Sequence, residues 1–157
     1  MAKETRATRA LTQAGAAFSV HAYDYDPAAD HIGMQAAVAL GEPPARVLKT
    51  LMVLVDGKPA CAIVPSDAQV AMKKFAAALG GKAAEMMKPA DAERITGYKV
   101  GGISPFGQMR RLAVAIEAAA LGQAYVYLNG GQRGLQVRID PHEAARILDA
   151  RIAAIAA

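Results

Sequence analysis

The sequence predicts a single α+β domain with a mixed β-sheet, spanning residues 1–157. Three observations support this prediction. A length of 157 residues fits one ordinary domain, and no repeat, low-complexity linker or charge block divides the chain. A hydrophobic content of 54% excludes disorder, although 37 of the residues are alanine, so Val, Ile, Leu and Met must form most of the core. Strand pairs and helices also follow one another without regular βαβ alternation.

The first third of the chain changes between helical and strand patterns. Apolar residues at helical spacing predict a helix over 4–14 that stops at Gly15. Alternation of apolar and polar residues after Phe18 predicts a half-buried strand. The expected elements are, in order, helix 4–14, strand 18–23, loop 24–30, helix 33–40 and a short helical turn opened by Pro43-Pro44.

A buried β-hairpin is the clearest feature in the middle of the chain. Residues 49–55 and 59–64 are nearly continuous apolar runs, and Asp56-Gly57 between them is a typical turn pair. Asp67 is then expected to cap a helix that runs to Leu79. A short strand over 83–87 and a helix over 89–95 follow.

The last third is expected to hold three strands and a terminal helix. A glycine-rich loop over 96–107 comes first, and the strands follow at 112–116, 124–128 and 135–139. Asp140-Pro-His-Glu has the pattern of a capping box with proline at the first helical position, so it starts the terminal helix.

Charge and cysteine content narrow the class of function. The formal net charge of +4 favours polyanionic partners, although only weakly. The single cysteine, Cys61, excludes an intrachain disulfide and a cysteine-based zinc site. No signal-peptide segment and no membrane-spanning stretch is visible, so we expect a cytoplasmic protein without a membrane partner.

Three features could bind an anionic ligand, and each also has an ordinary structural explanation. Lys49 opens an apolar strand, where an ammonium group either extends to solvent or meets an anion. The loop with Gly101 and Gly102 could direct backbone N–H groups at an oxyanion, or it could be a tight crossover turn. Asn129-Gly-Gly-Gln-Arg133 is a turn whose arginine could bind phosphate or remain solvated.

Other candidate catalytic groups do not form a recognisable centre. The histidines lack metal-ligand spacing, and Cys61 alternates within an apolar strand as a buried small hydrophobic residue does. Ser104 lies outside any nucleophile elbow, and no catalytic triad is visible. The residues alone therefore predict a pocket for an anionic ligand, without a metal and without a covalent nucleophile.

Several segments, taken in order, resemble the YbaK family of aminoacyl-tRNA deacylases, which are relatives of the editing domain of bacterial prolyl-tRNA synthetase. The most specific segment is the long run Thr96-Gly-Tyr-Lys-Val-Gly-Gly-Ile-Ser-Pro-Phe-Gly-Gln. The others are His21-Ala-Tyr-Asp-Tyr-Asp-Pro, Val47-Leu-Lys-Thr-Leu-Met-Val, Gly130-Gly-Gln-Arg-Gly-Leu and Ile147-Leu-Asp-Ala. The resemblance covers nearly the whole chain and implies a free-standing deacylase whose mixed sheet or partial barrel is surrounded by helices.

The resemblance also implies a substrate and a site. The family hydrolyses Cys-tRNA(Pro) without a metal or another cofactor, and the substrate thiol is thought to attack its own ester carbonyl. The enzyme then needs only to hold the ester in a near-attack geometry and to stabilise the developing oxyanion. The catalytic residues implied for this chain are Lys49, Gly101 and Gly102. The substrate-binding residues implied are Tyr23, Ile32, Thr50, Ser104, Asn129, Arg133 and Gln136.

Three positions depart from the family pattern and leave the amino-acid specificity open. Ile32 stands where the family often has Tyr or Phe, Asn129 where it has Ser, and Gln136 where it has Asp. Hydrolysis of Cys-tRNA(Pro) is therefore the first hypothesis. A deacylase for tRNA(Pro) carrying alanine, serine or a small non-protein residue is the second, and a non-catalytic module that binds tRNA or a synthetase is the third. The expected partners are the acceptor end of tRNA(Pro) and, less directly, prolyl-tRNA synthetase.

Overall fold

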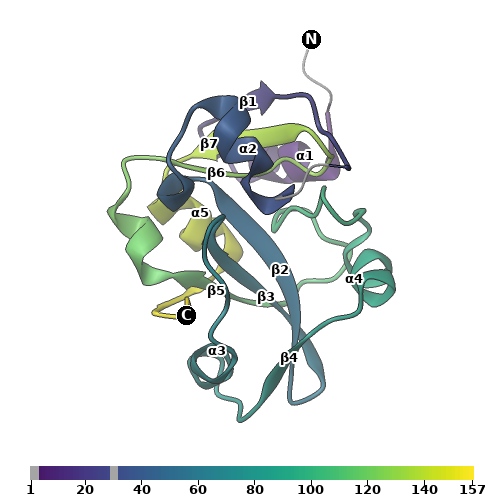
Figure 1. Cartoon of the computed structure of the whole chain (residues 1–157), viewed down its shortest axis with the longest axis vertical. Coiled ribbons are helices and arrows are strands. Elements are labelled where there is room, and N and C mark those ends of the chain that lie inside the picture. The colour runs from purple at the N-terminus through teal and green to yellow at the C-terminus, as the bar shows by residue number, and fades with distance from the viewer. Residues whose placement is uncertain (1–3, 29–31) are drawn as a thin grey trace.

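The computed structural model describes residues 4–28 and 32–157 and contains two β-sheets with helices around them (Figure 1). The larger sheet has the strand order β4-β2-β3-β5-β8 and the smaller has the order β1-β7-β6. Its antiparallel and parallel pairs make the larger sheet mixed, as expected. The strands are β1 Phe18–Ala22, β2 Leu48–Val55, β3 Lys58–Pro65, β4 Ala84–Met86, β5 Ala113–Glu117, β6 Val126–Asn129, β7 Leu135–Ile139 and β8 Arg151–Ala153.

The hairpin of β2 and β3 is the centre of the larger sheet and confirms the strongest expectation from the sequence. The two strands pair in antiparallel register from Leu48 with Pro65 to Val55 with Lys58. The turn places Asp56 and Gly57 at positive φ of 48° and 81°, which explains the Asp-Gly pair there. Cys61 is fully buried in β3, as its alternating surroundings predicted.

The smaller sheet has one apolar face and one polar face. Val20, Leu128 and Val137 belong to the main hydrophobic core, because every second residue of these strands points into it. The opposite face carries His21, Gln136 and Asn129 side by side, since His21 pairs with Gln136 and Asn129 pairs with Gln136. An isolated bridge joins Tyr127 of this sheet to Val47, the residue just before β2.

The helices lie at the expected places with one exception. They are α1 Arg6–Gln13, α2 Ile32–Leu40, α3 Met72–Ala78, α4 Pro89–Thr96 and α5 Pro141–Leu148, with short 3-10 helices at Pro44–Arg46 and Ala118–Gly122. The side chain of Asp140 caps α5 by accepting hydrogen bonds from the N–H groups of His142 and Glu143. The predicted N-cap is therefore confirmed, but the Glu143 carboxylate pairs with Arg146 instead of returning to the Asp140 N–H, so the reciprocal half of the expected capping box is not formed.

The exception is the helix expected to begin at Asp67. α3 begins only at Met72, and its N-cap residue, Ala71, makes no side-chain hydrogen bond. The preceding residues pair with the end of the chain instead: Val70 forms a bridge with Ala156, and Ala71 N–H donates to the Ile155 carbonyl at 2.7 Å. Asp67 was thus wrongly predicted as a cap, because a long-range pairing takes precedence over the local signal.

The chain after α5 was not predicted in detail and forms part of the larger sheet. β8 runs parallel to β5, and the buried Glu117 carboxylate accepts hydrogen bonds from the N–H groups of Ile155 and Ala156, both at 2.9 Å. Burial raises the pKa of Glu117, but the hydrogen bonds from the N–H groups of Ala119, Ala156 and Ile155, together with the charge of Lys74, lower it by more, so the carboxylate stays ionised. No helix among the described residues is long and apolar enough to cross a membrane.

Candidate functional site

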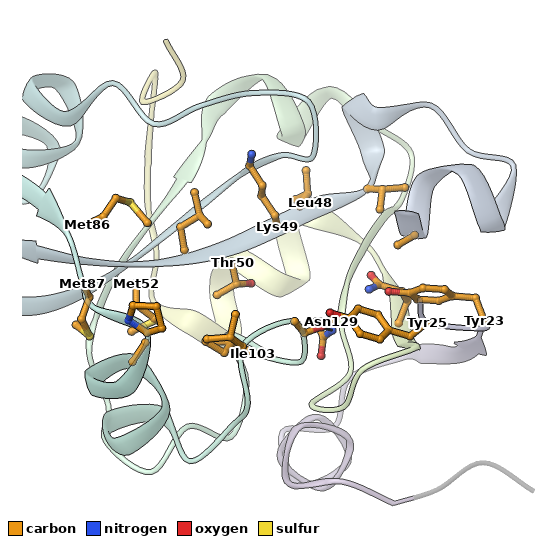
Figure 2. A pocket seen from close by; sticks show the side chains of 18 residues that line it. Tyr23, Tyr25, Leu48, Lys49, Thr50, Met52, Met86, Met87, Ile103 and Asn129 are labelled. Carbon is orange, nitrogen blue, oxygen red and sulfur yellow. Dashed lines mark hydrogen bonds between the residues drawn. The ribbon is translucent and has the colours of Figure 1, made fainter. Parts of the chain in front are cut away.

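A cavity of about 280 Å³ opens beside β2, between the two sheets (Figure 2). β4 pairs with β2 only at Val53–Val55, and the last contact along this edge is the Met87 N–H donating to the Met52 carbonyl at 3.1 Å. The edge of β2 from Leu48 to Met52 therefore faces the cavity. Its lining residues are Tyr23, Tyr25, Ala36, Val47, Leu48, Lys49, Thr50, Leu51, Met52, Met86, Met87, Pro89, Ala92, Val100, Gly101, Ile103, Asn129 and Gln136.

The pairing pattern fixes which backbone groups face the cavity. In an antiparallel strand the N–H and C=O groups of successive residues point to alternate edges. Since the Met52 carbonyl points to the edge shared with Met87, the N–H and C=O groups of Thr50 point to the same edge, where none of the described strands covers them. The wall of the cavity thus contains a peptide donor and acceptor as well as side chains.

Two buried side-chain oxygens at the cavity have no partner among the described residues. They are Thr50 Oγ1 and Gln136 Oε1, which come from β2 and β7. An unpartnered buried polar atom costs about 1–3 kcal/mol of stability. Other interactions in the fold must offset this cost in the unliganded protein. A ligand that donates hydrogen bonds to the two oxygens would remove it. These two atoms mark the polar end of the cavity.

Tyr23 closes the polar end. Its backbone N–H donates to the Gly134 carbonyl at 2.9 Å, which fixes the chain after β1 against the turn before β7. Burial raises the pKa of Tyr23, while the nearby Gln136 side chain lowers it by less, so the phenol remains neutral and can donate a hydrogen bond. Tyr25, two residues further on, also lines the cavity and was not predicted from the sequence.

Lys49 reaches the cavity from the face of β2 opposite to Thr50, as Figure 2 shows. The side chain is half-buried beside an apolar strand. Burial lowers the pKa of Lys49, and the negative charge of Asp67 raises it by less. The ammonium group therefore has little compensation inside the protein and is well placed to meet an anionic ligand.

The two glycines of the loop after α4 have different roles. At Gly101, φ is +90° and an added Cβ would lie 2.6 Å from the Tyr25 hydroxyl, so only glycine fits. At Gly102, an added Cβ would lie 2.8 Å from the Arg133 backbone nitrogen. The Gly102 N–H donates to the Lys99 carbonyl at 2.8 Å and is not available to an oxyanion, contrary to the role expected for it. Among the described residues, no hydrogen bond engages the Gly101 N–H, which remains the available donor.

Asn129 and Arg133 hold this loop through hydrogen bonds to its backbone. Asn129 Nδ2 donates to the Gly101 carbonyl at 3.3 Å, and its Oδ1 accepts from the N–H groups of Gly131 and Gln132. Arg133 Nε donates to the Val100 carbonyl at 2.9 Å, and its guanidinium lies over Tyr25. Asn129 lines the cavity, whereas Arg133 lies behind its wall.

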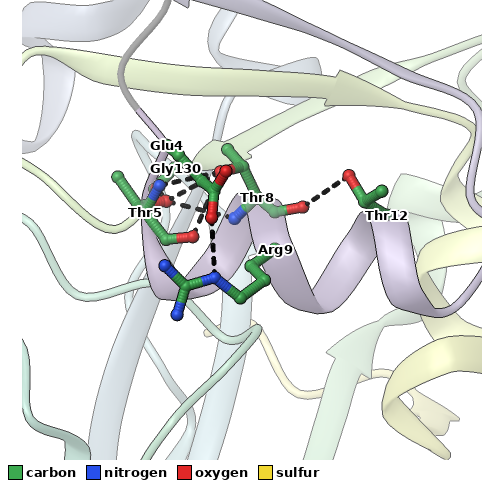
Figure 3. A network of polar contacts seen from close by, with 6 residues as sticks. All are labelled: Glu4, Thr5, Thr8, Arg9, Thr12 and Gly130. Carbon is green, nitrogen blue, oxygen red and sulfur yellow. Dashed lines mark hydrogen bonds and ion pairs between the residues drawn. The ribbon is translucent and has the colours of Figure 1, made fainter.

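The turn after Asn129 is held from outside by the first helix (Figure 3). Thr5 Oγ1 donates to the Gly130 carbonyl at 2.5 Å. Thr5 and Thr8 form a reciprocal capping box at the start of α1, and Thr12 donates to the Thr8 carbonyl. The position of the cavity wall therefore depends on a helix that is distant in sequence.

Of the two remaining expected residues, Ser104 does not line the cavity and the placement of the Ile32 side chain is not described. Ser104 is fully buried, and its Oγ accepts a hydrogen bond from the Phe106 N–H at 3.1 Å, so it shapes the loop. Ile32 begins α2, and its side chain lies outside the described residues. Within the described residues, no group of three or more His, Cys, Asp or Glu side chains could hold a metal ion.

The opposite end of the cavity is apolar and was not predicted. Met52, Met87 and Ala92 are buried there, together with the partly buried Ile103. Methionine adapts its shape to the group it contacts. These residues follow ordinary core spacing, so no sequence pattern marks them as bordering a cavity.

Comparison with known proteins gives three consistent findings. The aminoacyl-tRNA editing domain family matches residues 26–147. An Enterococcus faecalis protein assigned as the Cys-tRNA(Pro)/Cys-tRNA(Cys) deacylase EbsC is 31% identical over 136 residues, covering 85% of this chain and 82% of the relative. A proline–tRNA ligase of Acidithiobacillus ferrooxidans is 31% identical over 85 residues, which are 54% of this chain and 15% of the ligase.

Solved structures share the fold. A protein assigned as a trans-editing enzyme for prolyl-tRNA synthetase matches with a TM-score of 0.84 and 23% identity, covering 97% of this chain and 95% of that one. A hypothetical protein matches with a TM-score of 0.86 and 20% identity, covering 98% and 100%. These likenesses confirm the α+β architecture.

Proposed function

The chain belongs to the aminoacyl-tRNA editing domain family, and from this premise we propose that residues 1–157 act as one deacylase domain that hydrolyses mischarged Cys-tRNA(Pro). The observation that carries the proposal is the polar end of the cavity. Thr50 Oγ1 and Gln136 Oε1 are buried there without partners, and Lys49 reaches the same cavity. A free-standing binding module would have no need of such a combination.

The chemistry proposed for this site requires no nucleophile from the protein. The thiol of the esterified cysteine loses its proton, and its sulfur attacks the ester carbonyl carbon. The bond from that carbon to the ribose oxygen breaks, the oxygen takes a proton, and water then hydrolyses the resulting thiolactone to free cysteine. The protein contributes by holding the ester so that sulfur and carbon lie close together.

Negative charge develops on the carbonyl oxygen during the attack. Lys49 and the Gly101 N–H are the proposed donors that stabilise this charge, and loss of one such donor typically raises the barrier by about 2.7–4 kcal/mol. Thr50 and Gln136 are proposed to hold the amino acid, because their oxygens can accept hydrogen bonds from its ammonium group. Tyr23 closes the site beside Gln136.

A second candidate substrate is tRNA(Pro) that carries another small amino acid. The observation in its favour is that Gln136 is neutral where the family pattern has an acidic residue, which weakens the selection of a particular charged group. Both candidates place the protein in the cytoplasm with tRNA(Pro), and with prolyl-tRNA synthetase as the source of the mischarged substrate.

The test is a single-turnover deacylation panel of tRNA(Pro) charged with Cys, Ser, Ala and Pro. We expect rapid release of cysteine, much slower release of serine and little release of alanine, because a hydroxyl ionises far less readily than a thiol of pKa near 8.5. Equal rates for Cys, Ser and Ala would overturn substrate assistance and indicate a water held by the protein. No hydrolysis of any of the four would overturn the proposed function.

A further inference from the structure

The polar face of the smaller sheet continues beyond the cavity. Gln136 lines the cavity, and Arg138 lies two residues further along β7 on the same face. Two residues of an antiparallel strand span about 6.8 Å, so Arg138 is close to the cavity wall but outside it. Arg138 pairs with Ser19 on β1 and with Tyr127 on β6, and Tyr125 comes just before that strand.

Arg138 is held on a fixed aromatic platform. Its guanidinium carbon lies 3.6 Å from the ring centroid of Tyr125, and that of Arg46 lies 4.7 Å from the same centroid. Tyr125 donates to Glu42 at 3.0 Å and accepts from Arg46 at 3.0 Å. The ring therefore cannot move easily, and the arginine stacked on it has little conformational freedom to lose when it binds a ligand.

Arg46 and Arg138 differ in what their N–H groups do. Arg46 donates to Glu42, Gln123 and Tyr125. Arg138 is exposed, its guanidinium lies within side-chain hydrogen-bonding reach of Tyr127, and it forms no ion pair with any described residue. Arg9, Arg94 and Arg146 on the surface are paired with carboxylates, whereas Arg110, Arg111 and Arg151 are exposed without an ion pair to a described residue, so the stacking on Tyr125 is what distinguishes Arg138.

The local charge is positive. Arg46 and Arg138 together carry two positive charges against one negative charge on Glu42. Burial raises the pKa of Glu42, but hydrogen bonds from Tyr125, Tyr127 and Arg46 lower it by more, so this carboxylate is ionised and already satisfied. A guanidinium has five N–H donors, so one contact with Tyr127 leaves others for a ligand. Arg138 is thus an oriented cation without a carboxylate partner, the arrangement that suits a phosphate group.

We propose that Arg138, stacked on Tyr125, is a phosphate-binding site for the backbone of the tRNA whose acylated end occupies the cavity. This inference rests on the proposed function. The ligand in the cavity is the end of a nucleic acid, so the chain leading to it must cross the rim, and Arg138 lies one strand repeat from the wall. The contact adds affinity without reading base sequence.

The experiment measures the Kd of uncharged tRNA(Pro) transcript for the full chain by fluorescence anisotropy at several salt concentrations. Arg138→Gln should raise Kd about tenfold near physiological salt, as expected for the loss of one charge-assisted hydrogen bond. It should also reduce the slope of log Kd against log salt by about 0.7–0.9, the contribution of one phosphate contact. Arg138→Lys keeps the charge but loses the stacked guanidinium, so we expect it to keep most of the slope and only part of the affinity.

The matched control is Arg151→Gln, which removes the same charge from β8 in the other sheet. We expect Kd to stay within about twofold of the wild-type value and the salt slope to stay within about 0.2 of it, because a distant exposed charge is largely screened. Equal effects of Arg138→Gln and Arg151→Gln would overturn the site and leave the deacylase proposal intact, because wild-type hydrolysis is measured separately. A wild type that neither binds tRNA nor hydrolyses the charged panel would overturn both.

Discussion

The two halves of β2 have the same partner strand, β3, but they differ in what lies along their other edge. From Val53 to Val55 the strand lies between β3 and β4, and both of its edges are paired. From Leu48 to Leu51 no described strand pairs with the edge opposite to β3, and this edge faces the cavity. The covered half contributes to the core, whereas the open half carries Lys49 and Thr50.

The difference shows how one strand can supply both stability and a site. Val53 is fully buried, so its side chain contributes the full free energy of apolar burial. In the open half, Thr50 Oγ1 has no partner and the ammonium of Lys49 is partly desolvated, and both features are unfavourable in the unliganded protein. Substitutions in the open half should therefore change activity, and substitutions in the covered half should change stability.

Lys49→Ala is expected to have the largest effect, a loss of hydrolysis by at least a hundredfold without a loss of stability. The rate falls because one charged donor at the developing oxyanion is removed. Single-turnover rates and urea unfolding measure the two effects, and Lys58→Ala, an exposed lysine at the start of β3, is the control. A folded Lys49→Ala protein with wild-type activity would remove Lys49 from the mechanism.

The sign of the stability change follows from the pKa. Burial lowers the pKa of Lys49, and Asp67 offsets this only in part, so the folded state disfavours the charged form. The penalty is fully present below the folded pKa and disappears as the pH rises past the unfolded value near 10.4. At neutral pH the free energy of unfolding of Lys49→Ala should therefore equal or exceed that of the wild type, with a smaller difference in alkaline solution.

Val53→Ala should give the converse result. It removes two buried methyl groups where Val53 packs in a core cluster with Val64 and Phe75, which costs about 2 kcal/mol of unfolding free energy. The urea midpoint measures this loss, and the single-turnover rate at low temperature, where the variant is folded, should stay within about twofold of the wild type. Lost activity in folded protein would show that the two halves are not independent.

The sequence predicted the elements well where their signals are local. The β2–β3 hairpin follows from two apolar runs around Asp56-Gly57, and α5 follows from its Asp140 cap. The helix start at Asp67 was wrong because Val70 pairs with Ala156 at the end of the chain. Patterns of neighbouring residues contain no information about such a long-range pair.

Only part of the candidate site was predicted from the sequence, because some of its features depend on contacts between distant segments. The motif resemblance pointed to Lys49, Thr50 and Gln136, and the structure places all three at one cavity. The motif could not show that the Gly102 N–H is already bonded to Lys99, since that depends on the course of the loop. It also gave no sign of the methionines at the apolar end, which look like core residues in sequence. The roles of all these residues in hydrolysis remain predictions for the variants described above.

Substitution of Cys61 is expected to have the smallest effect on activity. It tests directly whether the reacting sulfur belongs to the protein or to the substrate. It pairs with Met52 across the hairpin, so it lies one strand away from the cavity at the boundary between the two halves of β2. The side chain is fully buried, and burial raises the pKa of its thiol to about 12. At neutral pH almost none of it is thiolate, the form that acts as a nucleophile.

Cys61→Ala should therefore keep the rate of Cys-tRNA(Pro) hydrolysis within about twofold, while the small cavity left by the sulfur costs about 1 kcal/mol of stability. Cys61→Ser should lose more stability, because a hydroxyl would be buried in place of a thiol without an assured partner. Rates on Cys- and Ser-charged tRNA(Pro), measured with both variants alongside urea unfolding, separate the two sulfurs. If Cys61→Ala folds but no longer hydrolyses Cys-tRNA(Pro), the reacting thiol belongs to the protein. If the rate falls when serine replaces cysteine on the tRNA but not when Cys61 is replaced, Cys61 has a structural role only. The reacting thiol then belongs to the substrate, and the residues that assist it are those of the open half of β2.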